Sequence, residues 1–399
     1  MALLKKYEFI LTAYGLFFVY YMQGIAYPEG MFISQGVLLI YILLGIYCFS
    51  KYFLRTNVPT PVKLWTVFCI IQIITFLVSP KTVIGIKYEA IGEVKTFMQF
   101  KGILVFTLSL YIGLRIGRSN LDYSKVISWL GFIFLIIAVF RYFYAALSYQ
   151  LEYGQKIQQN NGAYGFVTLI PFLPVMYNHY KKTTILAILV IVGFVIAGAK
   201  RGAILCLAVS ALIAILIIIK NVRLNLKHVF VGFIAITALC CFATYKYQQS
   251  EVLQYRLNRM DKVGIGQREV AYKVLFDHWV DDTNLLTKLF GNGSAQSVSV
   301  WGNYAHNDWL EILIDNGLLS VIIYALFFIS AFKYCARIEI DLTSKITCLT
   351  FLSIWFMQTV FSMGYTSIWS GLSMMLLGII WGQHRVSGVI RFRNNQGCY

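Results

Sequence analysis

Apolar segments close to membrane-spanning length recur along almost the whole chain, and this pattern restricts the chain to folds that lie in a lipid bilayer. Of the 399 residues, 59% are hydrophobic and 13% are charged, against about 45–50% and about 25% in soluble domains. No run alternates polar and apolar residues as the strands of an outer-membrane barrel do. We therefore predict an all-α integral membrane protein with about 12 transmembrane helices. The predicted spans are 9–27, 32–50, 64–79, 102–114, 126–140, 162–177, 183–199, 202–219, 229–245, 317–332, 346–363 and 365–382.

One long polar segment, 246–305, interrupts this pattern between predicted spans nine and ten. It divides the chain into three parts. The first, 1–245, holds spans one to nine. The polar segment itself is the second, and the third, 306–399, holds a His-Asn helix start, spans ten to twelve and a tail. A polar insert in a membrane protein is exposed to water, so we expect the chemistry of this chain beside it.

Basic residues set the predicted orientation. With the N-terminus in the cytoplasm, more than half of the 34 Lys and Arg residues fall in short inner loops or at the two ends, as the positive-inside rule requires. Both termini are therefore predicted to be cytoplasmic and the segment 246–305 to lie outside. The start of the chain lacks a small-residue cleavage site, so we expect a retained first helix. Since topology explains most of the net charge of +17, we predict membrane lipids, and no nucleic acid, as partners.

Two cations lie in a very short outer loop between spans seven and eight, against the charge rule. Lys200 and Arg201 stand between Gly198-Ala199 and Gly202, where the eighth span begins. The guanidinium of Arg201 would add to the unpaired N–H groups and the positive dipole end of that helix. Such a combination suits a phosphate anion. The alternative is that both side chains only anchor lipid headgroups.

The polar segment carries a third candidate cation, Arg268. Residues 247–266 are polar and basic, and from Gln267 the apolar spacing predicts an amphipathic helix to about Val280, with Arg268 in its first turn. A surface ion pair of Arg268 with Glu269 or Asp261 is the alternative to a ligand role. Residues 291–303, rich in Gly, Ser and Asn, predict a flexible loop able to close over a site.

The candidate catalytic residue is His306, at the start of the helix that leads into span ten. Asn303 or Asn307 is the expected N-cap. At 100° per residue, His306 shares a face with Gly317 and lies opposite the acids Asp308, Glu311 and Asp315. An exposed or structural histidine is the alternative. No metal is expected, because His306 has no partner at metal-ligand spacing and the eight cysteines fall in predicted spans or on the inner side.

At these residues the chain resembles the bacterial O-antigen ligase and O-antigen polymerase superfamily. About twelve spans, cytoplasmic ends and one large periplasmic segment agree with the family's topology. The family's periplasmic arginine before the eighth span matches Arg201, and its arginine in a Gly-x-Arg helix matches Arg268. Its signature of His-Asn, nine residues, Gly, two residues and a small residue or Tyr matches His306, Asn307 and Gly317. Ser320 departs from the Gly, Thr or Tyr expected at the last position.

The resemblance implies a lipid-carrier-dependent glycosyltransferase of the C-type fold in the bacterial inner membrane. It would move glycan from undecaprenyl pyrophosphate, on the periplasmic side, to an acceptor hydroxyl with inversion at the anomeric carbon. In this role Lys200, Arg201 and Arg268 would bind the pyrophosphate leaving group. His306 would accept the hydroxyl proton, for which an imidazole pKa of about 6.5 is suitable. Asn307 and Gly317 would support the site, without a cofactor or metal.

Four functions are compatible with this topology and these motifs. An O-antigen ligase, with lipid A-core as acceptor, is favoured by the His-Asn signature spacing and the single dominant outer segment. A polymerase would instead extend a second carrier-linked repeat unit. A flippase or other transporter is a third possibility, although the two halves of the chain look unlike each other, whereas transporters of this size commonly have related halves. A membrane scaffold without catalysis is a fourth, weaker alternative.

Overall fold

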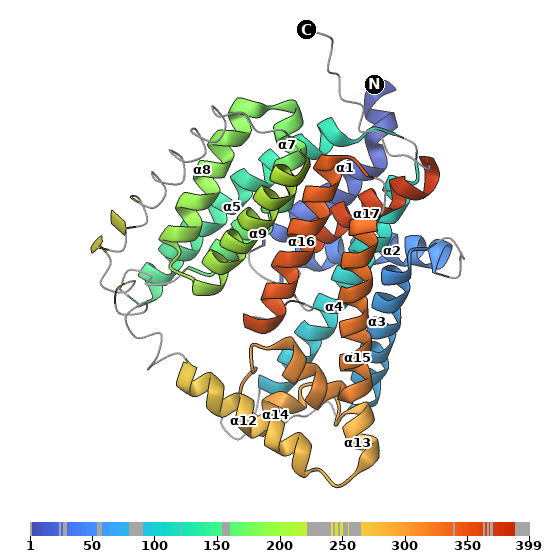
Figure 1. Cartoon of the computed structure of the whole chain (residues 1–399), viewed down its shortest axis with the longest axis vertical. Coiled ribbons are helices and arrows are strands. Elements are labelled where there is room, and N and C mark those ends of the chain that lie inside the picture. Colours follow the sequence, from blue (N-terminus) through green and yellow to red (C-terminus); the bar gives the residue numbers. More distant parts are fainter. Residues whose placement is uncertain are drawn as a thin grey trace.

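The protein is all-helical, as the sequence predicts, and no strand occurs in the part of the chain that the structure describes (Figure 1). The computed structural model describes the chain apart from residues 1, 24, 27–29, 54–57, 80–90, 120, 154–159, 222–240, 242–243, 246–247, 250–253, 255–264, 338–339, 362–363, 365–366, 368–369 and 388–399, and apart from the side chains of 2–6, 91–98, 152–153, 265–267 and 385–387.

The helices are α1 (Ala2–Tyr21), α2 (Phe32–Tyr52), α3 (Thr60–Val78), α4 (Ile91–Gly117), α5 (Ser124–Tyr153), α6 (Ala163–Val167), the 3₁₀ helix η1 (Ile170–Phe172), α7 (Leu173–His179), α8 (Lys181–Ala197), α9 (Arg201–Asn221), α12 (Ile265–Asp281), α13 (Leu285–Phe290), α14 (Gln296–Trp301), α15 (Asp308–Arg337), α16 (Leu342–Phe361) and α17 (Gly371–Ser387).

Among the described residues, seven helices are long and apolar enough to cross a membrane: α2, α3, α9, α15, α16 and most of α4 and α5. They coincide with seven of the predicted spans. Large apolar side chains on their outer surfaces are exposed, for example Leu39 (57%) on α2 and Leu216 (56%) on α9. Exposing such apolar surfaces to water is unfavourable in free energy, whereas contact with lipid tails is not. These are the features of a membrane-embedded protein.

The other five predicted spans differ from continuous membrane helices or lie outside the described residues. Pro171 and Pro174 break the predicted span 162–177 into α6, η1 and α7, because proline cannot donate the backbone hydrogen bond of a helix interior. Helices α8 and α17 have 17 residues each, and α1 ends at Tyr21 rather than at 27. Most of the span 229–245 falls outside the described residues. The total of twelve spans stays a prediction.

An aromatic core joins α3, α4 and α16 to the helix that follows His306. Trp65 of α3 packs on Trp355 of α16 and on Phe327 of α15, with ring centroids 5.0 Å and 5.3 Å apart. Phe106 of α4 lies 4.7 Å from Trp355. Each such pair stabilises the fold by about 0.5–1.5 kcal/mol beyond the area it buries. The part of α15 after Gly317 is therefore packed against α3, α4 and α16.

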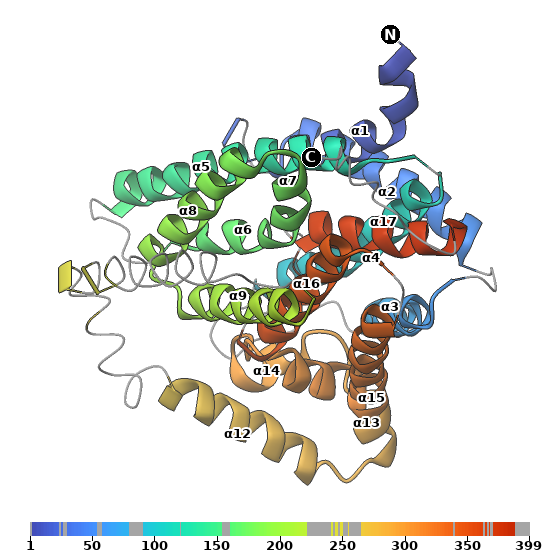
Figure 2. The same cartoon turned by 45° about the horizontal axis from the view of Figure 1, so that its top comes forward.

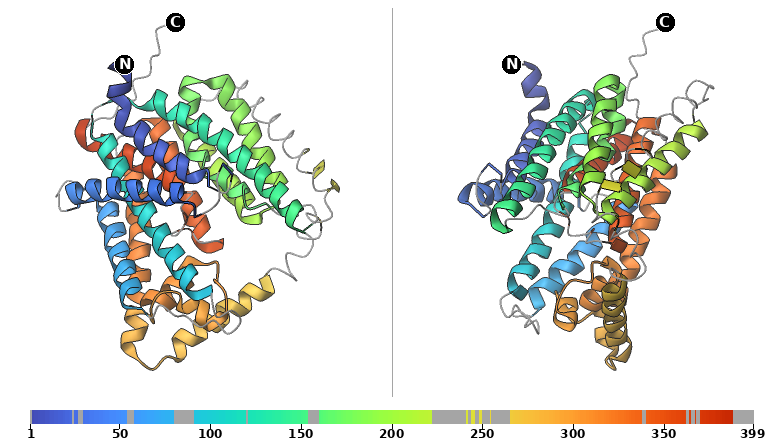
Figure 3. Two further views of the ribbon diagram at one scale, coloured as in Figure 1. Left: turned by 180° about the vertical axis from the view of Figure 1, so that it is seen from behind. Right: turned by 90° about the vertical axis from the view of Figure 1, so that its left-hand side faces the viewer.

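Helices α12, α13 and α14 gather at one end of the molecule, next to the start of α15 (Figures 1 and 2). The start of α1 lies at the opposite end, which Figure 3 shows from two further sides. Helix α8 runs from Lys181, at the end where α1 starts, towards the end with α12, and α9 returns from Arg201. The candidate cations and His306 thus belong to elements that meet at the same end.

Candidate functional site

Arg201 is the first residue of α9, as the sequence predicts. A turn with Ala199 in the left-handed region (φ 49°) joins α8 to α9, and the N–H of Ile204 donates to the carbonyl of Lys200 over 3.0 Å. The first N–H groups of α9 therefore point out of the helix beside Arg201. Its Nε is enclosed by protein and has no hydrogen-bond partner among the described residues. Lys200 lies in the same turn, partly buried.

Arg268 lies in the first turn of α12, and the predicted amphipathic helix is confirmed as Ile265–Asp281. The buried face of α12 contains Leu275, two turns after Arg268. Tyr272, one turn after Arg268, packs beside Leu275. The Arg268 side chain is exposed and forms no ion pair with Glu269 or with any other described carboxylate. Asp261, the other partner considered, lies outside the described residues. Arg268 is thus a cation without a described counter-charge.

A residue that the sequence did not indicate, Tyr164 of α6, lies at the start of α9. A Cβ atom at Gly202 would lie only 2.4 Å from Tyr164 Oη, so the hydroxyl rests on the backbone next to Arg201. Tyr164, 37 positions before Arg201 in the sequence, is thus packed against the first turn of α9. No local pattern pointed to Tyr164, because an aromatic residue near a proline-broken helix is common in a membrane core.

His306 precedes α15 and has a left-handed backbone, with φ 54°. Its N–H donates to Glu311 Oε1 over 2.9 Å. The predicted N-cap is confirmed for Asn307, whose Oδ1 accepts from the N–H groups of Trp309 (3.0 Å) and Leu310 (3.3 Å). The prediction that His306 lies on the helix face opposite the acids is wrong, because the helix begins at Asp308 and Glu311 reaches back to the His306 backbone.

Three buried acids hold this region together instead of lining an open face. Asp308 accepts the N–H of Gly364 over 3.0 Å and the hydroxyl of Tyr324 over 2.9 Å. Asp315 accepts the N–H groups of Ala295 and Ser297 over 3.0 Å and 2.8 Å. With Glu311 bound to the His306 backbone, each carboxylate satisfies backbone donors that would otherwise be buried without partners. The acids are anchors of the segment that carries His306.

The segment 291–303 is not the open loop that its composition predicted. Asp315 binds the first turn of α14 (Gln296–Trp301), and the N–H of Ser294 donates to Ser79 Oγ over 2.7 Å. The next residue pair, Tyr304 and Ala305, is also packed, since Ala305 contacts Leu275 of α12. Burial, followed by the charges of Glu311 and Asp315, raises the pKa of Tyr304, so its hydroxyl stays protonated. This part of the polar segment forms a scaffold under His306.

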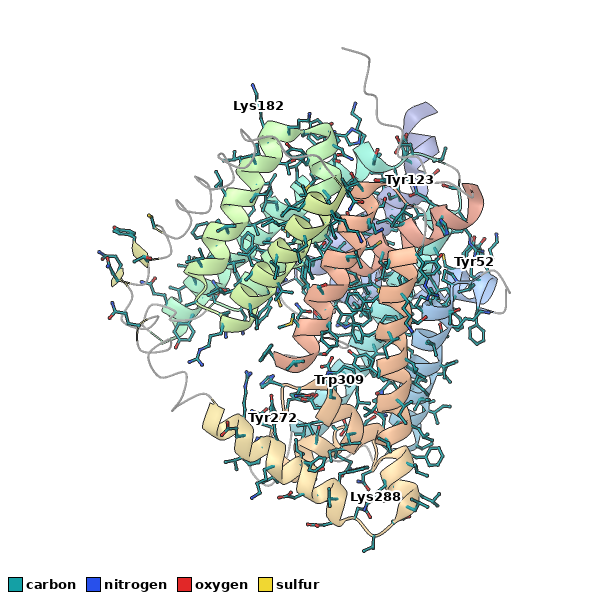
Figure 4. All side chains as sticks on the ribbon, viewed as in Figure 1. Tyr52, Tyr123, Lys182, Tyr272, Lys288 and Trp309 are labelled. Atoms are coloured by element: carbon teal, nitrogen blue, oxygen red, sulfur yellow. The ribbon has the colours of Figure 1, made fainter. Side chains whose placement is uncertain are left out.

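The packing of Ala305 on α12 links His306 to Arg268. Tyr272, one helical turn after Arg268, packs against the small core formed by Leu275, Ala305 and Ile314. Figure 4 shows Tyr272 on α12 and Trp309 on α15 at neighbouring positions of this end of the molecule. The indole of Trp309 donates to Thr359 Oγ1 of α16 over 2.9 Å and fixes the start of α15 to the membrane helices. The structure thus places His306 next to Ala305, which lies in one small core with Leu275 and Tyr272 of α12.

Gly317, the glycine of the His-Asn signature, marks a sharp kink inside α15. Its φ is 77° and ψ 176°, a conformation that essentially only glycine adopts. A Cβ atom there would lie 2.4 Å from the carbonyl carbon of Leu289 and 2.5 Å from the N of Gly291. The hydroxyl of Ser320 donates to the carbonyl of Asn316 over 2.9 Å, just before the kink. Ser320 therefore has a structural role at the position where the motif departs.

We expect Gly317→Ala to lower the free energy of unfolding by about 2–3 kcal/mol, because the new methyl group has neither an allowed φ nor room beside α13. Gly193→Ala in α8 is the matched control, since nothing lies within 4 Å of its added Cβ. Thermal unfolding in detergent measures both. Equal midpoints for the two variants would contradict the assignment of Gly317 as an obligatory kink.

Among the described residues, no group of three or more His, Cys, Asp and Glu side chains is arranged to hold a metal ion. The metal-free mechanism stays a prediction for solution experiments. No protein-family model matches the chain, and no curated protein matches it in sequence. The resemblance to O-antigen ligases and polymerases therefore depends on the topology and the short motifs alone.

Proposed function

We propose that this protein is an inverting glycosyltransferase that moves glycan from undecaprenyl pyrophosphate to an acceptor hydroxyl. The observation that carries the proposal is the packing of the segment just before α15, which carries His306, against α12, which carries Arg268 in its first turn. Arg201 begins α9, and α9 starts towards the same end of the molecule. A pyrophosphate on a lipid carrier lies at headgroup depth, and fixed guanidinium groups at a helix start suit it in both charge and geometry.

In the proposed reaction the acceptor oxygen attacks the anomeric carbon as the bond to the pyrophosphate oxygen breaks. Negative charge then grows on the leaving group, and Arg201 and Arg268 stabilise it because their positions are set before the reaction starts. His306 takes the proton from the acceptor hydroxyl, and a single displacement inverts the anomeric centre.

The proposed site faces the periplasm, and both chain ends face the cytoplasm. Support comes from the basic residues at the end of the molecule where α1 starts. Lys182, at the start of α8, lies there in Figure 4, and Lys220 and Arg337 occupy the last turns of α9 and α15. Short loops rich in Lys and Arg are retained on the cytoplasmic side of a membrane. A bacterial inner membrane is the setting in which such a carrier is used.

Lipid A-core is the proposed acceptor, which makes the protein an O-antigen ligase. The test is transfer by the purified full-length protein, given undecaprenyl-pyrophosphate glycan with either lipid A-core or a second carrier-linked repeat unit. Product on lipid A-core is expected, and lengthening of the carrier-linked chain would identify a polymerase instead. In sealed right-side-out vesicles, transfer should require donor and acceptor on the outer side. Absence of transfer to both acceptors, with folded protein, would contradict the proposed function.

A further inference from the structure

The short helix α13, which follows α12 after a tight turn, exposes three large apolar side chains. Leu285, Leu286 and Phe290 are 67%, 66% and 59% exposed, and none of the six residues of α13 is buried. Surfaces in water seldom gather such side chains without a partner, whereas helices that lie on a bilayer do. We call these three residues the apolar tip.

The polar groups of the α12–α13 turn bind one another, which leaves the tip apolar. Asn284 caps α13, because its Oδ1 accepts the N–H of Leu286 over 3.0 Å. Lys288 Nζ donates to the carbonyl of Val280 over 2.7 Å, and the indole of Trp279 donates to the carbonyl of Lys288 over 3.2 Å. A turn that satisfies its own polar groups is suited to the boundary of a bilayer, where water is scarce.

Contacts with the end of α3 fix the position of the apolar tip. The N–H of Ser294 donates to Ser79 Oγ over 2.7 Å, and a Cβ atom at Gly293 would lie 2.7 Å from the same oxygen. Phe290 precedes Gly293 by three residues, which span at most about 11 Å. The end of α13 therefore lies within a short reach of Ser79, which directly follows α3 (Figures 1 and 3).

The last turn of α3 lies at the boundary of the hydrocarbon. Helix α3 has 19 residues and is about 28 Å long, close to the roughly 30 Å of a bilayer core. Its last two residues, Leu77 and Val78, are 67% and 76% exposed, as expected of side chains in contact with lipid. The apolar tip thus continues the lipid-facing surface of α3 at the depth where hydrocarbon gives way to headgroups.

We infer that the apolar tip inserts into the bilayer surface on the side of α12, where lipid acyl chains cover Leu285, Leu286 and Phe290. Helices on a membrane surface bury their apolar side chains about 5–10 Å into the boundary between headgroups and acyl chains. Such an anchor fixes the height of α12, and with it Arg268, relative to the lipid headgroups. The inference does not rest on the proposed function, since the partner is the bilayer whatever the reaction.

The experiment measures the depth of single nitroxide labels in the full-length protein, reconstituted in bilayers of phosphatidylcholine and phosphatidylglycerol. Leu286→Cys places the label at the apolar tip, and Asp277→Cys is the matched control, because Asp277 is exposed on α12. Wild-type protein treated in the same way gives the background of the native cysteines. The label at 286 should collide more often with oxygen, which dissolves in lipid, than with a water-soluble nickel chelate, at a depth of about 5–10 Å. The label at 277 should show the reverse preference.

Two results would overturn the inference. If the nickel chelate reaches the label at 286 as freely as the label at 277, the apolar tip lies in water. If neither oxygen nor the chelate reaches the label at 286, protein covers the tip and the lipid partner is wrong. Spectral broadening at 286 that disappears on dilution with unlabelled protein would then identify a second copy of the chain as the cover.

Discussion

His306→Asn should leave a folded, membrane-inserted protein that transfers glycan roughly 10²–10⁴ times more slowly than the wild type. In the proposed reaction the imidazole accepts the proton of the attacking hydroxyl, which an amide cannot do. Asparagine is the appropriate replacement, because His306 has φ 54° and asparagine tolerates the left-handed region better than most residues do. The measurement is the initial rate of transfer at saturating donor, with donor binding measured on the same preparation and expected to be unchanged.

The matched control for this variant is His278→Asn. His278 is exposed on α12, at the same end of the molecule, and has no place in the mechanism. It should transfer glycan at the wild-type rate. If His306→Asn retained more than about a tenth of that rate, His306 would not be the base. Chelator is present in all reactions, and loss of wild-type turnover on its addition would contradict the metal-free mechanism.

The sequence predicted those parts of the site that depend on local patterns. Two cations between apolar runs marked the start of α9 at Arg201, and apolar periodicity marked α12 with Arg268 in its first turn. Asn307 was a recognisable N-cap because a side chain binds donors two and three residues later. Each of these features is encoded within a few residues, so one sequence suffices to find it.

The parts that the sequence missed depend on contacts between distant segments. Asp315 and Glu311 were predicted on the helix face opposite His306, yet Asp315 binds the N–H group of Ser297 in α14 and Glu311 binds that of His306. A helical wheel could not show this, because it assumes one regular helix from 306 onward. Tyr164 reaches the start of α9 only after α6 and α9 have packed. Long-range convergence of this kind leaves no local signal.

In the fold, too, the sequence predicted the features that depend on local patterns and missed those that depend on contacts between distant segments. Uninterrupted apolar runs predicted the seven helices of spanning length, since lipid requires every backbone group to be paired within the helix. Pro171 and Pro174 break the predicted span 162–177, but the sequence did not predict the turn at α6 that results from the break. That turn presents Tyr164 to the start of α9. The break in the helix therefore affects the site, because it determines where Tyr164 lies.

Arg201→Lys should lower transfer by about 10- to 100-fold, although the charge at residue 201 is kept. The guanidinium can bind two phosphate oxygens at once through a planar fork, whereas an ammonium acts as a point charge. At the start of α9 the enclosed Nε of Arg201 fixes the direction of that fork. The transfer rate and the Kd for undecaprenyl pyrophosphate measure the effect, and both should deteriorate while protein abundance in the membrane stays normal.

Arg337→Lys is the control for Arg201→Lys, because Arg337 is exposed in the last turn of α15 at the opposite end of the molecule. It should behave like the wild type, which would show that the loss is specific to the site and not to the total positive charge. Arg268→Ala should reduce transfer strongly, as Arg201→Ala does, because both groups stabilise the same leaving group. If Arg201→Ala retained wild-type transfer while Arg268→Ala abolished it, the anion site at the start of α9 would be wrong. The pyrophosphate would then be bound by α12 and the residues around it, and the enclosed guanidinium of Arg201 would be an anchor of α9 at the membrane surface.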